Sequence, residues 1–550
     1  MLDTNTQTEI EDLFTPEEQA TLTPFVTSLD ANIFGLRNIP EVIKGALFSR
    51  YSRSGKSLRR MLLDEFIRIP EADFQAIVGT HNDSAAQLLA VRQAEVFYDR
   101  VLVGYGDDSV AELGGAHLAC EGISNIAAKA LEDSRIGLSP LEKSTRYVLF
   151  NSKVRGQYRY VRPAEIMRSE YAANYEACMD GLFDTYSALL EPVQASLREL
   201  NPRDAQTSER AYRSAIRAKA CDVLRGLLPM ATRTNVGLFG NGRAFEYLLT
   251  KLYASDVDEL RSLAGNMQVA LDQLIPSFVK RAKNERGAAY QSYMRSCRQQ
   301  VAALSQEVNS TAIKPLIAGV TLVDYDHDAE LRICAAILYS QGALALSEAR
   351  SLAEHMSPAQ RSALLAAYIG EREVRFHKPG RALEEARYSF DIVADIGAYR
   401  DLQRHRILSQ ERQHFSTCHG YSIPAEIRAA AQEAAYTQAL ERAAALYQRI
   451  VVKQPDAAQY AVPLAFNMRW RVTLNLRELY HLVELRSAPQ GHPSYRRIAQ
   501  GMFACVQAIQ PELVAGMRFV DMSDYALERL DAERRLDAKL AVKGRARDEG

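Results

Sequence analysis

The sequence has few of the features that mark secreted, membrane-spanning or zinc-binding proteins. Its seven cysteines are scattered and form no Cys-x-x-Cys pair, which argues against a zinc site or a disulfide framework and favours reduced, mostly buried thiols. No apolar run reaches the roughly 18 residues that span a bilayer. The start of the chain, Met1 to Asn5, lacks the basic residues and apolar core of a signal peptide. We therefore expect a cytoplasmic protein with no metal ion and no membrane partner.

An excess of charge of either sign is also missing. The chain has 67 Lys and Arg against 68 Asp and Glu, a net charge of −1, so no global field draws it to nucleic acid. Its 550 residues are 47% hydrophobic and 25% charged, as in an ordinary globular protein of two to four domains. Basic residues form no long stripe with interleaved aromatics, so we expect no nucleic-acid partner. Any anion binding must come from local clusters.

The clearest local cluster is the tripeptide Arg404-His405-Arg406. Two permanently charged guanidiniums flank a side chain that titrates near neutrality. Such a cluster repels itself unless an anion, a carboxylate or an electron-rich ring lies between the charges. A solvated basic turn is the plain alternative for an arbitrary Arg-His-Arg. This one differs because a weaker copy of its surroundings occurs much earlier in the chain.

The two copies keep a steady offset. Glu112 precedes Glu384 by 272 residues, and Arg135 precedes Arg406 by 271. The other two landmarks are a proline and, 12 residues later, an asparagine: Pro229 and Asn241 in the first copy, Pro463 and Asn475 in the second. Four matched landmarks in one order indicate a duplication.

Patterns along the chain predict several elements of both kinds. Residues 319–325 are rich in β-branched side chains and predict a strand. Residues 329–346 have helical periodicity, and residues 171–200 and 256–306 predict long amphipathic helices whose Met and Tyr side chains are core. The charged tail from residue 527 predicts a surface helix.

At the repeated landmarks the chain resembles the flavin-dependent thymidylate synthases. The signature of that family is Arg-His-Arg, then seven residues and a Ser, with Glu two residues before the Ser and Arg-Tyr shortly after it. Arg-x-x-x-Pro, Asn-x-Arg and Leu-Arg follow downstream. The resemblance covers most of residues 45–255 and 318–500. It implies an α+β fold with two tandem synthase-like domains, each a small mixed sheet with long helices, packed as a pseudo-dimer. We expect an extension at 1–44, domains at 45–310 and 311–526, and a tail at 527–550.

Neither half keeps the whole signature, and the losses are complementary. The first half keeps Glu142-Lys143-Ser144-Thr145-Arg146-Tyr147 and Arg225 but has Asp133-Ser134-Arg135 in place of the tripeptide. The second half keeps the tripeptide and Leu485-Arg486. Family sites lie between subunits, so the resemblance implies one composite nucleotide site built from both halves. A second site would be lost, because it would combine Asp133, Leu252, His414 and Gln459.

The resemblance also implies roles for individual residues. The expected nucleotide-binding residues are Glu142, Ser144, Thr145, Arg146, Arg225, Arg404 and Arg486, of which Ser144, Arg146 and Arg486 are expected to be catalytic. The expected FAD contacts are Glu112, Asn241, Arg243, Glu384, His405, Arg406, Ile407, Asn475, Arg477, His481 and His492. Arginine forks suit a phosphate or a uracil carbonyl, and an arginine near the base stabilises negative charge on the ring.

The function implied is reductive methylation of dUMP to dTMP. Methylenetetrahydrofolate would donate the carbon, FAD would carry the hydride and NADPH would re-reduce it, in a homodimer that forms a pseudo-tetramer. Two alternatives stay open: a divergent flavoenzyme with another nucleotide-like acceptor, and a non-catalytic FAD- or nucleotide-binding protein. Glu112 and Glu384 have a plain alternative as structural partners of nearby arginines, and Cys418 has one as a small apolar filler.

Overall fold

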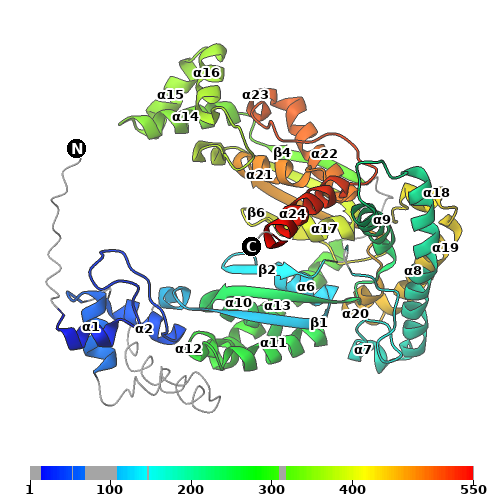
Figure 1. Ribbon diagram of the computed structural model, residues 1–550, viewed down its shortest axis with the longest axis horizontal. Helices are drawn as coiled ribbons and strands as arrows, with labels where there is room; N and C mark the ends of the chain where they lie inside the picture. The colour runs from blue at the N-terminus through cyan, green and yellow to red at the C-terminus, as the bar shows by residue number, and fades with distance from the viewer. Residues whose placement is uncertain are drawn as a thin grey trace. The chain divides into compact units, whose positions relative to one another are not determined.

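The computed structural model describes residues 14–51, 54–68, 108–144, 146, 148–308 and 318–548 (Figure 1). The chain forms two compact units, each assembled from separated stretches. Unit 1 comprises residues 1–121, 134–142 and 235–310, and unit 2 comprises 122–133, 143–234 and 311–550. Segments of the first repeat contribute to both units, so the units describe packing, and the repeat bounds of 45–310 and 311–526 stay a prediction.

Unit 1 is built around a three-stranded sheet with the order β1-β3-β2. The strands are β1 (Gly115–Ser124), whose last three residues lie in unit 2, β2 (Leu138–Glu142) and β3 (Arg233–Asn241), which begins in unit 2. β2 and β3 are antiparallel, from Leu138 opposite Gly240 to Glu142 opposite Val236. The helices of this unit are α1 (Pro16–Leu22), α2 (Glu41–Tyr51), α3 (Leu58–Leu62), η1 (Leu63–Ile67), η3 (Asp108–Glu112), α10 (Gly242–Tyr253), α11 (Asp258–Leu271), α12 (Pro276–Val279), η5 (Lys280–Lys283) and α13 (Glu285–Val308).

Unit 2 has a four-stranded antiparallel sheet with the order β4-β5-β7-β6. These strands are β4 (Gly319–Tyr325), β5 (Arg387–Asp395), β6 (Leu408–Arg412) and β7 (Asn467–Asn475). β5 and β7 pair along their whole length, from Arg387 opposite Asn475 to Asp395 opposite Asn467. Alternate β7 residues, including Trp470, are buried, as expected for a strand with one face on the core.

The helices of unit 2 pack around this sheet. Before β4 come α6 (Asn125–Glu132), α7 (Ala164–Met167), α8 (Ala172–Leu200), α9 (Glu209–Leu224) and η4 (Arg225–Leu227). After it come α14 (Ala329–Gln341), α15 (Leu346–His355), α16 (Pro358–Ile369), η6 (Arg381–Glu385), α17 (Ile396–Leu402), α18 (Ala425–Ala429), α19 (Glu433–Val451), α20 (Pro455–Ala458), η7 (Gln459–Ala461), α21 (Leu476–Arg486), α22 (Pro493–Ile509), α23 (Pro511–Val514) and α24 (Leu530–Asp548). α8 lies between α9 and α19 (Figure 1). Among the described helices, none combines the length and apolar character that crossing a membrane requires.

The duplication is visible in the order of the elements. The strand order β1-β3-β2 of the first repeat matches β5-β7-β6 of the second, and in each repeat a strand is followed by a helix, then a strand, then long helices and a short 3-10 helix. Within unit 2 the two matched prolines, Pro229 and Pro463, lie opposite each other. Met230 N donates to Val462 O at 2.8 Å beside them. The α+β fold with two tandem copies is confirmed.

Most predicted elements are confirmed, with different ends. The strand at 319–325 is β4, the helix at 171–200 is α8, and the tail forms α24. The helix predicted over 329–346 ends at Gln341, where Gly342 is extended. The prediction for 256–306 is wrong in two respects: the segment is not one continuous helix, and Tyr290 and Tyr293, expected in the core, are 43% and 64% exposed. It divides into α11, α12 and α13, because Pro276, which has no N–H, begins a new helix after Ile275, whose backbone (φ −141°, ψ 49°) is not helical.

Candidate functional site

Arg146 lies at the centre of a charged cluster. It belongs to the part of the signature that the first repeat keeps. It follows β2, is 8% exposed and lies in unit 2. Its Nε is 3.0 Å from Asp222 Oδ1, and its Nη1 donates to Gln490 O at 3.4 Å. Its Cζ lies 5.5 Å from the centre of the Tyr495 ring. Asp222 belongs to α9 and Tyr495 to α22, so both repeats fix this guanidinium.

Arg225 is a second buried guanidinium of the first repeat. It begins η4, directly after α9, and is 5% exposed. A Cβ on Gly397 would come within 2.8 Å of Arg225 Nη2 and of Asp395 Oδ1. Gly397 lies in α17 of the second repeat, so the missing side chain is what allows Arg225 to approach that helix.

The arginines of the second repeat meet the same cluster through Asp401. Arg486 is the last residue of α21, and its Nη1 lies 3.8 Å from Asp401 Oδ1. Burial alone would raise the pKa of Asp401, but Arg146, Arg404, Arg486 and Arg225 together hold that pKa below its usual value. One carboxylate therefore lies in the field of four arginines, two from each repeat.

Burial and charge shift the other groups in consistent directions. Burial raises the pKa of Asp222 and of Asp395, with Arg146 and Arg225, respectively, opposing the shift. Burial lowers the pKa of Arg225. For Arg146 burial acts in the same direction, but Asp222, Tyr495 and Asp401 outweigh it and raise its pKa. Four arginines therefore face the three aspartates 222, 395 and 401, and the Nε of Arg404 also lies 3.3 Å from the buried Glu132 Oε1.

A hydrogen-bonded relay connects Glu478 to Arg486. His405 is 4% exposed, and its Nδ1 lies 2.8 Å from Glu478 Oε1. Arg486 Nε donates to His405 Nε2 at 3.0 Å. A nitrogen that accepts carries no hydrogen, so the imidazole proton is on Nδ1 and is donated to the carboxylate. Burial raises the pKa of Glu478 to about 7.

His405, Glu478 and His481 also form a cluster of potential metal ligands. Their ligand atoms lie within 4.8 Å of one another, and two histidines with a carboxylate are a donor set that zinc accepts. Both nitrogens of His405 are already engaged, and the Arg486 guanidinium at Nε2 repels a second cation. The donor set therefore does not fit a metal ion, and we assign none to it.

The residues expected at the flavin form the same pair in each repeat. In unit 1, Arg243 Nη1 lies 2.8 Å from Glu112 Oε1; in unit 2, Arg477 Nη1 lies 2.8 Å from Glu384 Oε1. Asn241 and Asn475 cap the helices that follow, with Oδ1 accepting from a backbone N–H at 2.8 and 2.9 Å. Each of these residues therefore stabilises the fold, through an ion pair or a helix cap, whether or not it also contacts a ligand.

The remaining expected residues differ in exposure and in their contacts. Ser144 is exposed, and its Oγ accepts from Arg146 N at 3.3 Å. Arg406 is exposed, as is Ile407 at 63%. His492 caps α22: its Nδ1 accepts from Ser494 N at 3.1 Å and its Nε2 lies 3.3 Å from Asp222 O.

The other residues named from the sequence are Glu142, Thr145 and Cys418. Glu142 is buried in β2 of unit 1, opposite Val236, and Thr145 lies outside the described residues. Cys418 is exposed, so its interpretation as a small apolar filler is wrong.

Five residues of the cluster were not predicted from the sequence: Asp222, Asp395, Asp401, Glu478 and Tyr495. All except Asp395 lie within three positions of a predicted residue. Asp222 precedes Arg225, Asp401 precedes Arg404, Glu478 follows Arg477, and Tyr495 follows His492. A search for carboxylates and rings within three positions of each motif residue would have found these four, but not Asp395.

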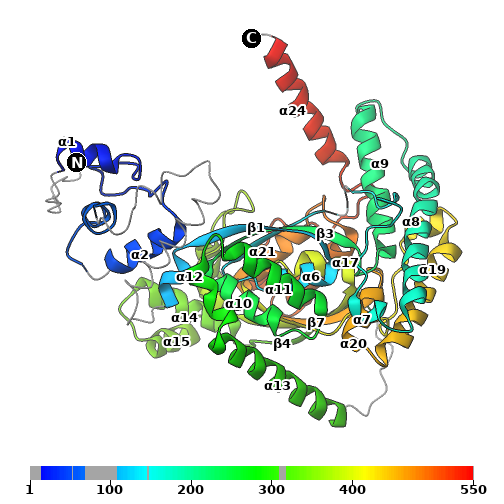
Figure 2. The same ribbon diagram turned by 90° about the horizontal axis from the view of Figure 1, so that it is seen from below.

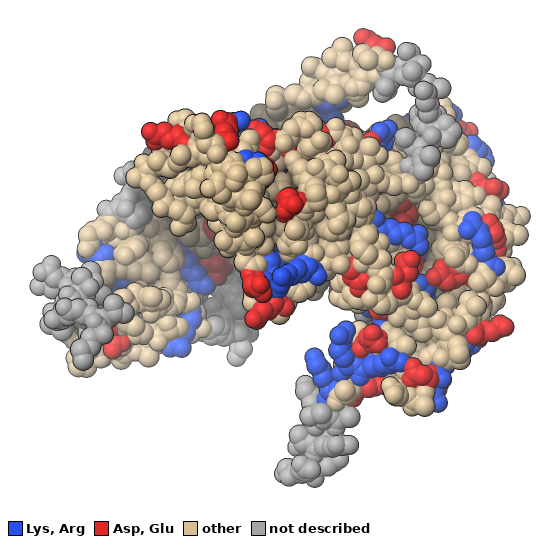
Figure 3. Space-filling view, turned by 90° about the horizontal axis from the view of Figure 1, so that it is seen from above, with Lys and Arg blue, Asp and Glu red and all other residues tan. Residues whose placement is uncertain are grey.

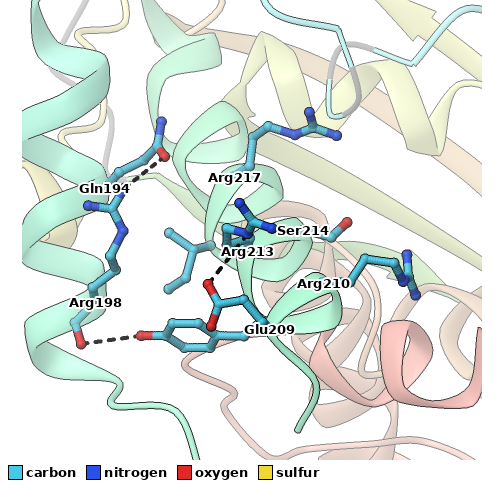
Figure 4. A pocket seen from close by; sticks show the side chains of 9 residues that line it. Gln194, Arg198, Glu209, Arg210, Arg213, Ser214 and Arg217 are labelled. Carbon is cyan, nitrogen blue, oxygen red and sulfur yellow. Dashed lines mark hydrogen bonds and ion pairs between the residues drawn. The ribbon is translucent and has the colours of Figure 1, made fainter. Parts of the chain in front are cut away.

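A groove of about 600 Å³ lies elsewhere, on α8 and the first half of α9. Figure 4 shows its arginines among acidic and polar neighbours. Arg213 Nε lies 3.4 Å from Glu209 Oε1, and Arg198 Nη1 lies 3.0 Å from Glu191 Oε1. The face drawn in Figure 3 likewise interleaves basic and acidic side chains. The groove shares no residue with the cluster around Asp401.

Comparisons with known proteins agree with the repeat. The family described as Thymidylate synthase complementing protein matches residues 67–277 and 321–512. A UPF0159 protein of Chlamydia pneumoniae is 44% identical over 528 residues, covering 96% of this chain and 98% of its own. A UPF0159 protein of Thermoplasma acidophilum is 32% identical over 530 residues, covering 90% and 99%.

A solved structure was also found, that of the UMP/dUMP methylase PolB from Streptomyces cacaoi bound with 5-Br dUMP. It is 19% identical, with a TM-score of 0.28, and covers 37% of this chain and 95% of its own. The family match includes both repeats and more than half of the residues. The chain therefore belongs to the thymidylate synthase complementing protein family, the flavin-dependent thymidylate synthases, and carries the family domain twice.

Proposed function

We propose that this chain is a flavin-dependent enzyme that methylates a pyrimidine nucleotide, with dUMP as acceptor and methylenetetrahydrofolate as one-carbon donor. The observation that carries the proposal is the cluster in unit 2, where Arg146 and Arg225 of one repeat and Arg404 and Arg486 of the other act on one carboxylate, Asp401. The two incomplete signatures thus supply their surviving arginines to one place.

The phosphate of the nucleotide is assigned to Arg146 and Arg225. Both residues are buried, and among the described residues no hydrogen-bond partner is found for Nη2 of either one. A buried guanidinium nitrogen without an acceptor is costly in a native fold. A phosphate offers the acceptors that these two forks suit, and charge-assisted bonds of this kind are strong. Ser144, next to Arg146, adds a hydroxyl donor.

The base is assigned to Arg486. Negative charge builds on the pyrimidine as C5 becomes nucleophilic, and a donor fixed beforehand stabilises that charge without reorganisation. The His405 Nε2 bond and the Asp401 contact fix the Arg486 guanidinium from two sides. In the proposed reaction the C5 proton of dUMP is lost, the carbon from methylenetetrahydrofolate is bonded there, a hydride completes the methyl group, and tetrahydrofolate is released.

The residues of the second repeat fit a flavin. Ile407 and Arg406 present an exposed apolar surface beside a cation, which suits a flat aromatic ring. Arg477 is held in place by Glu384 and by the carbonyl of Pro379 at 2.9 Å. When bound, the flavin supplies the hydride, and NADPH restores it. We assign His492 to the phosphate side instead, because Ser494 N and Asp222 O engage its ring nitrogens.

A second site of the same kind is not expected in unit 2. Gln459 stands where the first repeat has Arg225, and its amide is used locally: Oε1 accepts from Phe415 N at 3.1 Å and Nε2 donates to Asp456 O at 3.2 Å. His414, at the position of Ser144, lies 3.9 Å from Asp456. A neutral, engaged amide offers no charge to a phosphate.

The test is spectroscopic. Purified protein should be yellow and release FAD on denaturation, and dUMP should perturb the flavin spectrum. Arg146→Gln and Arg404→Ala, changes in different repeats, should each weaken that response. Arg146→Gln removes a charge-assisted bond to phosphate, which is worth roughly 1.5–3 kcal/mol, or about 10- to 150-fold in affinity. Arg404→Ala removes one of the four positive charges that act on Asp401. Arg213→Ala, which removes an arginine from the groove of Figure 4, is the matched control and should change nothing.

The outcomes separate the alternatives. A colourless protein that does not take up FAD would refute the flavoenzyme. A yellow protein that ignores dUMP but responds to another nucleotide would change the acceptor alone. Loss of the response in Arg404→Ala with full retention in Arg146→Gln would refute the shared site. Turnover is measured as tetrahydrofolate and dTMP formed in equal amounts with NADPH.

A further inference from the structure

The helix α13 presents a continuous apolar stripe to solvent. Tyr290, Tyr293, Val301, Leu304 and Val308 are between 43% and 81% exposed, and in the 24 residues of this helix only Gly287 is buried. At about 100° per residue these side chains fall on one face. Figure 2 shows α13 as one long helix along the edge of unit 1, beneath α10 and α11.

The other side of α13 is anchored to unit 1, so the stripe has a fixed direction. Arg295 Nη1 donates to Tyr253 O at 3.3 Å, and Arg298 Nη2 donates to Ala254 O at 2.5 Å. Gln291 Nε2 donates to Ala282 O at 2.7 Å. The helix cannot turn its apolar face inward without losing these bonds. Exposed apolar residues on so rigid an element indicate an interaction surface.

The stripe is symmetric about Cys297, which is exposed at the middle of α13. Tyr290 precedes Cys297 by seven residues and Leu304 follows it by seven. Tyr293 precedes it by four and Val301 follows it by four. Two such helices laid antiparallel, with a two-fold axis at Cys297, place Tyr290 opposite Leu304 and Tyr293 opposite Val301, so an aromatic ring faces an aliphatic side chain at both levels. Because these four positions are equally spaced on both sides of Cys297, the stripe can face a second copy of itself.

Charge and area agree with this pairing. The antiparallel arrangement brings Glu307, ten residues after the axis, beside Arg286 of the second copy, and the symmetry makes this pair twice. From the exposed fractions, the five side chains offer roughly 600 Å² per copy, or about 1,200 Å² for a pair, the lower end of specific interfaces.

We propose that two copies of this chain associate through α13, as an antiparallel helix pair with its two-fold axis at Cys297. The proposal does not depend on the enzymatic reaction, because α13 contributes no residue to the cluster around Asp401. It places the dimer contact on the segment that joins the two repeats.

Introducing a charge into the stripe of the full-length chain tests the pairing. Leu304→Glu should weaken dimerisation by about 100-fold or more, since the change enters the symmetric interface twice. Leu346→Glu is the matched control: it lies on α15 and is 60% exposed, against 62% for Leu304, and should leave the mass unchanged. Adding Tyr290→Lys to Leu304→Glu should restore the dimer, because the introduced lysine then faces the introduced glutamate only in antiparallel register. Light scattering after size exclusion measures the mass.

Cysteine cross-linking locates the axis. Copper phenanthroline takes two electrons from two Cys297 thiols as the S–S bond forms and two protons leave, so the wild type should give a covalent dimer. Cys297→Ser should abolish it, and Cys418→Ser, at the other exposed cysteine, should not. A monomeric wild type, a Leu304→Glu variant that still dimerises, or failure of the double variant to recover would each overturn the proposal. Circular dichroism confirms that the variants are folded.

Discussion

Replacing Glu478 by Gln is the sharpest perturbation of the relay to Arg486. With Glu478 ionised, its carboxylate holds the His405 proton on Nδ1 and leaves Nε2 to accept from Arg486. When Glu478 is protonated, that hold weakens and the imidazole can take the other tautomer, whose Nε2–H opposes the Arg486 N–H. Because burial raises the pKa of Glu478 to about 7, this change occurs near neutral pH. Nucleotide affinity should therefore fall as the pH falls through about 7.

The magnitude follows from the bond that is lost. A hydrogen bond made by a charged group contributes about 1.5 kcal/mol at the low end, or about tenfold in Kd. Between about pH 8 and about pH 6 the Kd for dUMP should rise about tenfold more in the wild type than in Glu478→Gln, whose amide oxygen still accepts from Nδ1–H but does not titrate. Ionisation of the dUMP phosphate affects both proteins equally, so the ratio cancels it.

Stability should move in the opposite direction. A carboxyl whose pKa is raised in the fold, here from 4.5 to about 7, contributes stability that is fully present below pH 4.5 and is lost as the pH rises through about 7. From about pH 5.5 to about pH 8 the wild type should lose about 2 kcal/mol more than Glu478→Gln. Urea unfolding at the two pH values measures this, and flavin-detected titration measures the affinity. Identical pH profiles for both proteins would refute the relay.

Three further outcomes are expected in unit 2. Arg372→Leu should lower the free energy of unfolding by about 3–5 kcal/mol, because it strands the buried Glu484 carboxylate that Arg372 contacts at 2.6 Å; a urea midpoint close to that of the wild type would contradict this. Gly397→Ala should weaken the dUMP response at least about tenfold, since its Cβ would lie 2.8 Å from Arg225 Nη2, and an unchanged titration would remove Arg225 from the site. Asn475→Ala should cost about 1 kcal/mol as a lost helix cap and also reduce bound FAD, whereas full FAD content would leave it a cap alone.

The repeat and its fold were predictable because the two copies keep the same distances along the chain between matched residues. Matched landmarks survive divergence when they lie at turns and helix starts, where few residue types are accepted. Asn241 and Asn475 are examples, since both cap a helix with the same hydrogen bond. Pro229 and Pro463 are another, because the two repeats meet there. The division of residues 256–306 was missed because helical periodicity continues across a proline that starts a new helix.

The sequence by itself determined that the chain is a divergent tandem copy and that each half has lost a different part of one signature. Only the tertiary structure decided which residues meet. Arg146 and Arg486 are 340 positions apart, yet both lie within 6 Å of the Tyr495 ring centre. The aspartates among the arginines and the Glu478 relay carry no signature, because what selects them is the charge they face in the folded chain. The spacing of motif residues along the sequence reflects local backbone geometry. The electrostatic field at a buried carboxylate is instead the sum of contributions from helices and loops that only folding brings together.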